Sequence, residues 1–161
     1  MLKKIFISIS LIILCVLTFF LYNKQKDVFL ISIKDDSKYL IDKNKLTFLF
    51  FFNPNCSACV YNLRNLTALK SILESYDIDF FCIINNDEYN YAGAARSIFV
   101  RFDLDYDILY DEILYKKYNI SLFPSFIIIY QDKIIFQKIG FTDWNDSKNT
   151  DELVELLKKY V

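Results

Sequence analysis

The sequence predicts an α/β fold in which helices pack on both faces of a mixed β-sheet. Two continuous apolar runs, at 46–52 and 78–84, are typical of strands buried on both faces, and a helical pattern follows each of them. Near the carboxyl terminus, two β-rich runs at 125–130 and 134–139 are separated by three polar residues. A connection that short joins antiparallel neighbours, so the sheet is expected to combine parallel and antiparallel pairs.

The first residues differ from the rest of the chain. Lys3 and Lys4 precede an apolar run over 5–22, which as a helix is about 27 Å long and matches the hydrocarbon core of a bilayer. We therefore predict a single-pass transmembrane signal anchor over 1–23, with the rest of the chain on the extracytoplasmic or periplasmic side of a bacterial inner (cytoplasmic) membrane. A cleaved signal peptide, or a lipoprotein signal with Cys15 lipidated, is the alternative, although no small-residue cleavage site follows the run.

Residues 24–46 are expected to form a linker and an N-terminal β extension. Within them, the β-rich run 28–33 and the short run 39–41 flank a turn-like polar segment, so they are predicted to pair as a hairpin. The domain that carries the chemistry is then expected to occupy 47–161, with no internal repeat and no second domain.

Helices follow from the spacing of apolar residues. Between Cys56 and Tyr76 apolar side chains recur every three or four residues, which predicts one continuous helix with a buried face. Shorter patterns predict the remaining elements, which are a helix over 91–102, a strand over 108–110, a helix over 112–118 and a final helix that begins at Asn149 or Thr150. Acidic residues near the start of that final helix and lysines near its end suit the helix dipole.

The composition narrows the classes of function. With 54% hydrophobic residues the chain can fill a core, and 19 basic against 20 acidic residues leave no electrostatic basis for nucleic-acid binding. The chain contains no histidine, which removes the commonest general base and the commonest metal ligand together. Its chemistry must therefore rest on cysteine, carboxylates, tyrosine or lysine.

The strongest chemical motif is Cys56-Ser57-Ala58-Cys59, which lies where a buried strand passes through the turn Asn53-Pro54-Asn55 into a helix. The unpaired N–H groups and the partial positive charge at a helix N-terminus stabilise a thiolate on Cys56. Cys59 lies one turn further on the same face, where it can form a disulfide with Cys56 or resolve a mixed disulfide. These two cysteines are therefore the predicted catalytic pair.

A metal site is the usual alternative for such a pair. Zinc needs two further ligands, and the only other cysteines are Cys15 in the predicted anchor and Cys82 in a buried apolar strand. Since the chain has no histidine either, we expect no metal and no cofactor. Cys82 itself is predicted to be a small core residue rather than a third redox thiol.

Three stretches resemble the thioredoxin superfamily, and within it the exported, membrane-tethered branch typified by TlpA and ResA. They are the strand and Cys pair at 47–59, the approach to a proline at 118–126, and the hairpin with its closing glycine at 127–140. The resemblance implies a thioredoxin-like three-layer sandwich with a mixed central sheet. It also implies a cis bond between Phe123 and Pro124, and contact of both residues with the substrate.

The resemblance further implies an activity, that of a thiol–disulfide oxidoreductase which reduces protein disulfides and takes its electrons from a membrane thiol carrier. Three features depart from the family pattern. Asn55 stands where many members have Trp before the first cysteine. The positions of the acids that tune the thiols hold Phe50 and Asn62, and Phe123 is larger than the residue usual before the proline. These departures leave a second hypothesis open, an interaction module of the same fold in which Cys56 and Cys59 form a static bridge without turnover.

Overall fold

The computed structural model of the chain describes residues 29–85 and 91–160. The predicted anchor over 1–23 lies outside the described residues. Within the part that is described, no helix combines the length and the apolarity needed to cross a membrane.

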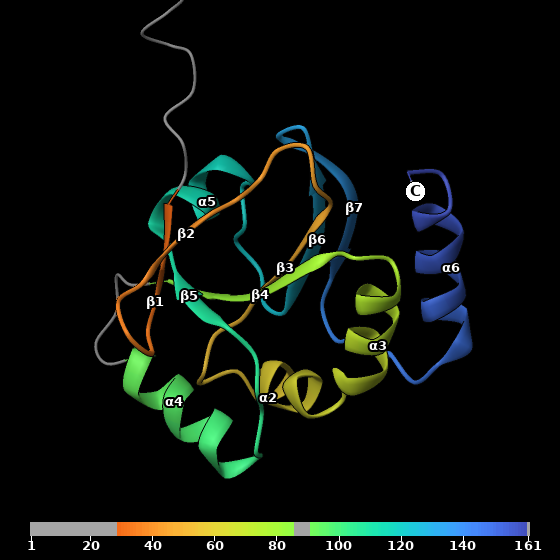
Figure 1. Cartoon of the computed structure of the whole chain (residues 1–161). Helices are drawn as coiled ribbons and strands as arrows, with labels where there is room; N and C mark the ends of the chain where they lie inside the picture. Colours follow the sequence, from red (N-terminus) through yellow and green to blue (C-terminus); the bar gives the residue numbers. More distant parts are fainter. Residues whose placement is uncertain (1–28, 86–90, 161) are drawn as a thin grey trace, which may run out of the picture.

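Seven strands form one mixed sheet in the order β2-β1-β5-β4-β3-β6-β7 (Figure 1). The strands are β1 (Phe29–Ser32), β2 (Lys38–Leu40), β3 (Thr47–Phe51), β4 (Asp79–Ile84), β5 (Ile108–Tyr110), β6 (Ser125–Tyr130) and β7 (Lys133–Ile139). β4 runs parallel to both β3 and β5, whereas the pairs β3–β6 and β6–β7 are antiparallel. The predicted mixed sheet and the predicted C-terminal hairpin are therefore confirmed.

The predicted N-terminal hairpin is part of this same sheet. β1 pairs antiparallel with β2 on one side and with β5 on the other, where Ile31 lies opposite Tyr110. The hairpin thus extends the sheet at the edge remote from β7.

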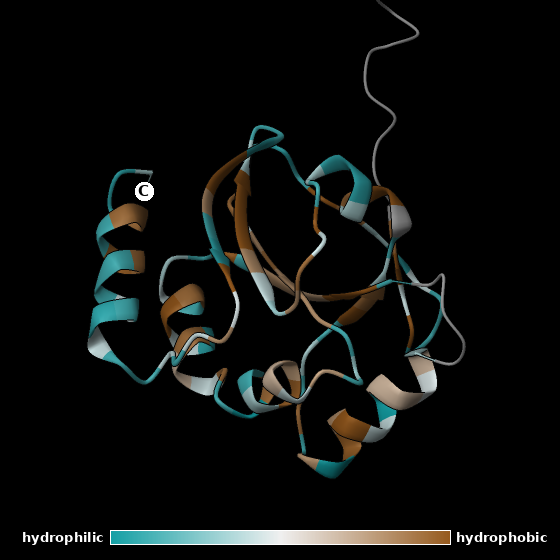
Figure 2. Cartoon of the chain, turned by 180° about the vertical axis from the view of Figure 1, so that it is seen from behind, coloured by the Kyte–Doolittle hydropathy of each residue, from teal (hydrophilic) through white to brown (hydrophobic). Residues whose placement is uncertain are grey.

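Helices cover both faces of the sheet. They are α2 (Ser57–Arg64), α3 (Thr67–Ser75), α4 (Tyr91–Arg101), α5 (Glu112–Lys117) and α6 (Ser147–Leu157). The buried side chains of α2, α3, α4 and α6 join one core cluster with Phe48 and Phe50, whereas those of α5 join a second cluster with Leu49 and Phe51. Figure 1 shows α5 on the opposite side of the sheet from the other helices. Hydrophobic colour fills the central strands in Figure 2, while the turns and outward helix faces are polar.

The prediction of one continuous helix from Cys56 to Tyr76 was wrong. α2 ends at Arg64. There the N–H of Asn65 donates to the carbonyl of Asn62, three residues earlier, at 2.9 Å, so the last turn is of the tighter 3₁₀ type instead of α-helical. α3 then begins at Thr67. Apolar spacing missed the break because the leucines on both sides of it, Leu63 and Leu69 among them, are buried as expected.

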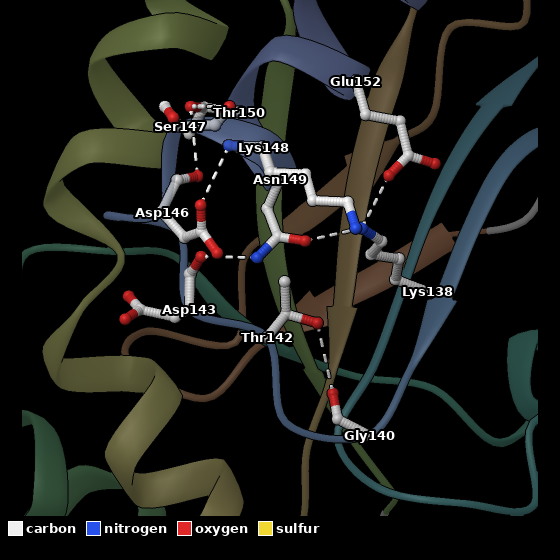
Figure 3. Close-up of polar contacts among 10 residues, drawn as sticks. All are labelled: Lys138, Gly140, Thr142, Asp143, Asp146, Ser147, Lys148, Asn149, Thr150 and Glu152. Atoms are coloured by element: carbon white, nitrogen blue, oxygen red, sulfur yellow. Dashed lines mark hydrogen bonds and ion pairs between the residues drawn. The ribbon is translucent and has the colours of Figure 1, made fainter.

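The final helix begins earlier than the sequence predicts. Asp146 caps α6, and one of its carboxylate oxygens accepts the N–H of Lys148 at 3.0 Å (Figure 3). Asn149 lies inside the helix and fastens it to its surroundings, because its amide donates to the carbonyl of Asp143 and accepts from Lys138. Asp146, which lies upstream of the expected cap at Asn149 or Thr150, is thus the residue that caps the helix.

Candidate active site

An asparagine turn delivers the first cysteine to the start of α2. The side-chain oxygen of Asn53 accepts the N–H of Asn55 at 2.8 Å, and its carbonyl accepts the N–H of Cys56 at 3.0 Å. The side-chain amide of Asn53 also donates to the hydroxyl of Tyr91 at 3.2 Å, which connects the turn to α4. Sequence reasoning recognised this segment only as a turn. Asn53 itself was the available signal, because an Asn side chain commonly accepts the N–H of the residue two positions later and so forms an Asx turn.

Cys56 is the N-cap residue of α2. Its backbone is extended, with φ −91° and ψ 114°, and its Sγ accepts the N–H of Cys59 at 3.2 Å. The sulfur therefore stands where a serine or aspartate oxygen usually caps a helix, facing the unpaired N–H groups of the first turn. Cys56 is partly exposed, so a substrate can reach this sulfur from solvent.

Cys59 has a different environment, since its side chain is buried and 0% exposed. Burial, together with the hydrogen bond to Cys56, raises the pKa of the Cys59 thiol well above its ordinary value. Cys59 is therefore a neutral thiol at physiological pH. The two sulfurs divide the chemistry, because one is accessible and capped by N–H groups and the other is protected and protonated.

The proline loop lies beside the first cysteine. The Phe123–Pro124 peptide bond is cis, as the resemblance implied. The carbonyl oxygen of Phe123 is 4.0 Å from the Sγ of Cys56. The ring of Phe123 packs against Tyr115, with 5.9 Å between ring centroids, so the large side chain is held by the core while the carbonyl faces the sulfur. The structure thus brings together all four residues singled out in the sequence.

The two positions at which the resemblance would place thiol-tuning acids hold side chains that do not titrate. Phe50 stacks on Phe126, with 4.6 Å between ring centroids. Asn62 is buried, and its amide donates a short hydrogen bond to the carbonyl of Thr142 while its oxygen accepts the N–H of Thr142 at 3.5 Å. This contact joins α2 to the loop between β7 and α6 across 80 residues of sequence. Nothing in the local sequence pattern pointed to it.

Gly140 ties the same loop to the proline. Its N–H donates to the carbonyl of Pro124 at 2.8 Å, and its φ of +88° lies in the region that glycine adopts without strain. Figure 3 shows Gly140 at the end of β7, with the hydroxyl of Thr142 donating back to its carbonyl. The loop that contacts α2 is therefore also anchored to the proline beside Cys56.

Cys82 lies in the core and takes no part in this site. Its side chain is 0% exposed, and burial, with a smaller contribution from Asp107, raises the pKa of its thiol. The prediction that it is a core residue is confirmed. Among the described residues, no group of three histidine, cysteine, aspartate or glutamate side chains lies close enough together to hold a metal ion.

No sequence-family model matches the chain, and no curated protein matches its sequence significantly. Solved structures of similar fold are numerous. StoA from Bacillus subtilis aligns with a TM-score of 0.62 and 19% identity over 75% of this chain and 93% of that one. A thiol:disulfide interchange protein of the thioredoxin family from Chlorobium tepidum gives 0.62 and 14% over 79% and 92%.

A third similar structure is a secreted disulfide oxidoreductase of Mycobacterium tuberculosis that is homologous to DsbE of E. coli. It aligns with a TM-score of 0.57 and 18% identity over 83% of this chain and 96% of that one. At these identities the likeness establishes the fold, and it confirms the thioredoxin-like sandwich that the sequence predicted.

Proposed function

We propose that this chain, which has the thioredoxin fold, is a thiol–disulfide oxidoreductase that reduces protein disulfides through Cys56 and Cys59. The observation that carries the proposal is the contrast between the two sulfurs. An accessible sulfur caps a helix N-terminus beside a cis-proline loop, and a buried thiol lies one turn further along. A static structural bridge needs neither the accessibility nor the adjacent proline carbonyl.

The reaction begins at Cys56. Its thiolate attacks one sulfur of the substrate disulfide, forming a mixed disulfide and releasing the other substrate sulfur as a thiolate that takes a proton from solvent. Cys59 then loses its proton and attacks the Sγ of Cys56, which releases the second substrate thiol. Two electrons pass to the substrate, and the Cys56–Cys59 pair is left as a disulfide.

The second step is expected to be the slower one near neutral pH. The pKa of Cys59 is raised by burial, and Phe50 and Asn62 offer no carboxylate to accept its proton. Deprotonation then depends on water or on the departing substrate thiolate. Resolution of the mixed disulfide should therefore accelerate as the pH rises.

The proline loop is proposed to bind the substrate chain. Phe123 places its carbonyl 4.0 Å from the Sγ of Cys56, where an extended substrate segment can donate an N–H to it in the manner of a strand. Pro124 keeps its own carbonyl occupied by the N–H of Gly140. Of these two carbonyls, that of Phe123 is therefore the one proposed to accept a substrate N–H.

The cellular setting follows from the apolar run at 5–22. We propose that it tethers the domain to the extracytoplasmic face of a bacterial inner membrane, where a membrane thiol carrier reduces the Cys56–Cys59 disulfide after each turnover. The similar structure from Mycobacterium tuberculosis is described as secreted, which agrees with such a location.

Insulin reduction by the full chain, with dithiothreitol as electron donor, tests the proposed activity. We expect turnover in the wild type, none above background in Cys56→Ser, and wild-type turnover in the matched control Cys82→Ser. Turnover that survives in Cys56→Ser would falsify the assignment. A wild type that is inactive with every thiol donor would instead favour the interaction module.

The substrate itself can be captured with Cys59→Ala, because this variant forms the mixed disulfide but lacks the thiol that resolves it. Expressed in the native membrane, it should accumulate adducts that disappear when Cys56 is also replaced. A single dominant adduct would identify a dedicated client, and a broad mixture would indicate a general reductant.

A further inference from the structure

Two exposed aromatic side chains from different elements lie together on the surface. Tyr61 of α2 is 52% exposed, and Phe141, in the loop after β7, is 54% exposed. Their rings meet edge to face with 5.2 Å between centroids. Single exposed apolar residues are common on proteins, but two large rings held together in solvent are unusual enough to need a reason.

The pair is held in place by buried polar contacts. Asn62, the neighbour of Tyr61, bonds to both backbone groups of Thr142, the neighbour of Phe141. Gly140, on the other side of Phe141, donates to the carbonyl of Pro124. The rings are therefore fixed relative to the redox helix and to the proline loop, which lowers the entropy lost when a ligand packs against them.

The pair is connected to Cys56 through the proline loop. Gly140, which precedes Phe141, donates to the carbonyl of Pro124, and the carbonyl of the preceding Phe123 is 4.0 Å from the Sγ of Cys56. An extended chain advances about 3.3 Å per residue, so a side chain a few residues from the substrate cysteine is expected to reach the rings while its sulfur is at Cys56.

We infer that Tyr61 and Phe141 form a specificity-determining subsite that receives an aromatic or large aliphatic side chain of the substrate segment. The favoured substrates are then disulfides flanked by an apolar residue, as in polypeptides that have not finished folding. Asn62 acts as a positioning residue, since it touches the loop that carries Phe141 and not the substrate. This inference rests on the proposed function and narrows its substrate class.

Activated peptides test the inference directly. The probes are short peptides whose single cysteine carries a thiopyridyl group, with one Phe placed in turn at each of three positions on either side, and matched peptides with Ser in its place. The thiolate of Cys56 attacks the peptide sulfur and expels pyridine-2-thione, which is followed by absorbance. The protein is the full chain with Cys59→Ala, in one detergent at one concentration.

We expect one Phe position to react about tenfold faster than its Ser counterpart, which is the upper end of the measured contribution of an aromatic contact. Tyr61→Ser and Phe141→Ser should each reduce that ratio at least about threefold. The double variant should reduce it no further than the stronger single variant, because the two rings act as one surface. Detergent favours the Phe peptides equally in every variant, so the change of ratio is the readout.

Val100→Ser is the matched control, since Val100 is an exposed apolar residue on α4, outside the loop and helix that form the subsite. It should leave the Phe/Ser ratio unchanged. Equal rates for every Phe and Ser peptide in the wild type, or a ratio that survives both ring substitutions, would overturn the subsite and leave the oxidoreductase intact. If neither peptide series reacts at Cys56, the proposed function itself fails.

Discussion

The two ends of the strand pair β3–β6 have opposite characters. At the carboxyl end of β3, the sheet presents a partly exposed cysteine, a cis-proline loop and a carbonyl that faces the sulfur of that cysteine. At the other end, which we call the closed end, ion pairs and a backbone hydrogen bond hold the turn between β6 and β7 in place. The carboxylate of Asp132 lies 2.5 Å from the ammonium of Lys117 and 3.4 Å from that of Lys43, and the N–H of Gln131 donates to the carbonyl of Lys43.

The difference shows how one sheet separates stability from chemistry. The closed end satisfies its polar groups internally, so a change there affects folding slightly and the reaction not at all. The redox end keeps a sulfur and a carbonyl available to a substrate, and buried hydrogen bonds behind them hold their geometry. The predictions below test this separation.

The largest expected effect concerns thiol reactivity. With iodoacetamide at neutral pH, Cys56 should be labelled at least about a hundredfold faster than Cys59 or Cys82, because its side chain is partly exposed while theirs are buried. Burial raises the pKa of both slower thiols. Their thiolate fraction therefore grows only in alkaline solution, and their labelling should rise with it.

Mass spectrometry of the labelled peptides resolves each cysteine, including Cys15. Labelling of Cys82 at the rate of Cys56 in the native protein would contradict the core position of β4. Labelling of both residues in urea serves as the control for intrinsic reactivity.

A smaller but substantial effect, on the free energy of unfolding, is expected at the buried contact between Asn62 and Thr142, which supports the redox end. Asn62→Ala removes the amide that bonds to Thr142 and leaves buried backbone groups unpaired, which should lower the free energy of unfolding by about 2–4 kcal/mol. Urea unfolding followed by circular dichroism measures the loss. Asn65→Ala, in which an exposed amide loses its bond to the carbonyl of Tyr61, is the matched control and should cost less than about 1 kcal/mol. Equal losses would show that the Asn62 contact does not hold the loop.

The smallest effect is expected at the closed end. Burial opposes ionisation of Asp132, but hydrogen bonds from Lys117 and Lys43 outweigh it, so the pKa of this carboxyl is lowered. A lowered pKa gives stability that is present above the unfolded-state pKa and lost as the pH falls through the folded-state value. Asp132→Asn should therefore cost under about 1 kcal/mol at neutral pH, and the difference from wild type should vanish in acid.

Urea midpoints of wild type and Asp132→Asn between about pH 6 and pH 2 measure this difference. Insulin reduction by the variant should match that of the wild type. An Asp132→Asn chain with impaired turnover would break the proposed separation of the two ends.

Much of this architecture could be predicted from local patterns. The apolar run at 46–52 implied a strand buried on both faces, and every residue of β3 is buried. The three-residue connection before Ile134 implied the final hairpin. The spacing of Cys56 and Cys59 at the start of a helix located the candidate site. Each of these features depends on neighbours within a few residues, which a sequence displays directly.

Other features depended on contacts between distant segments. The bond between Asn62 and Thr142 joins residues 80 positions apart, and the pairing of β1 with β5 places the N-terminal hairpin beside a strand far along the chain. The break between α2 and α3 was hidden because leucines on both sides of it face the same core. Periodicity reports which side of an element is buried, and it does not report where the element stops.

The sequence by itself determined the fold class and the two sulfurs, because hydrophobic period and motif spacing are local properties, and its resemblance to the thioredoxin superfamily added the proline beside them. Only the tertiary structure decided that Cys59 is buried while Cys56 is not, that the Phe123 carbonyl rather than its ring faces the sulfur, and that Tyr61 meets Phe141. Burial and hydrogen bonding between segments arise when the sheet and its helices close on one another, and no single stretch of sequence contains them.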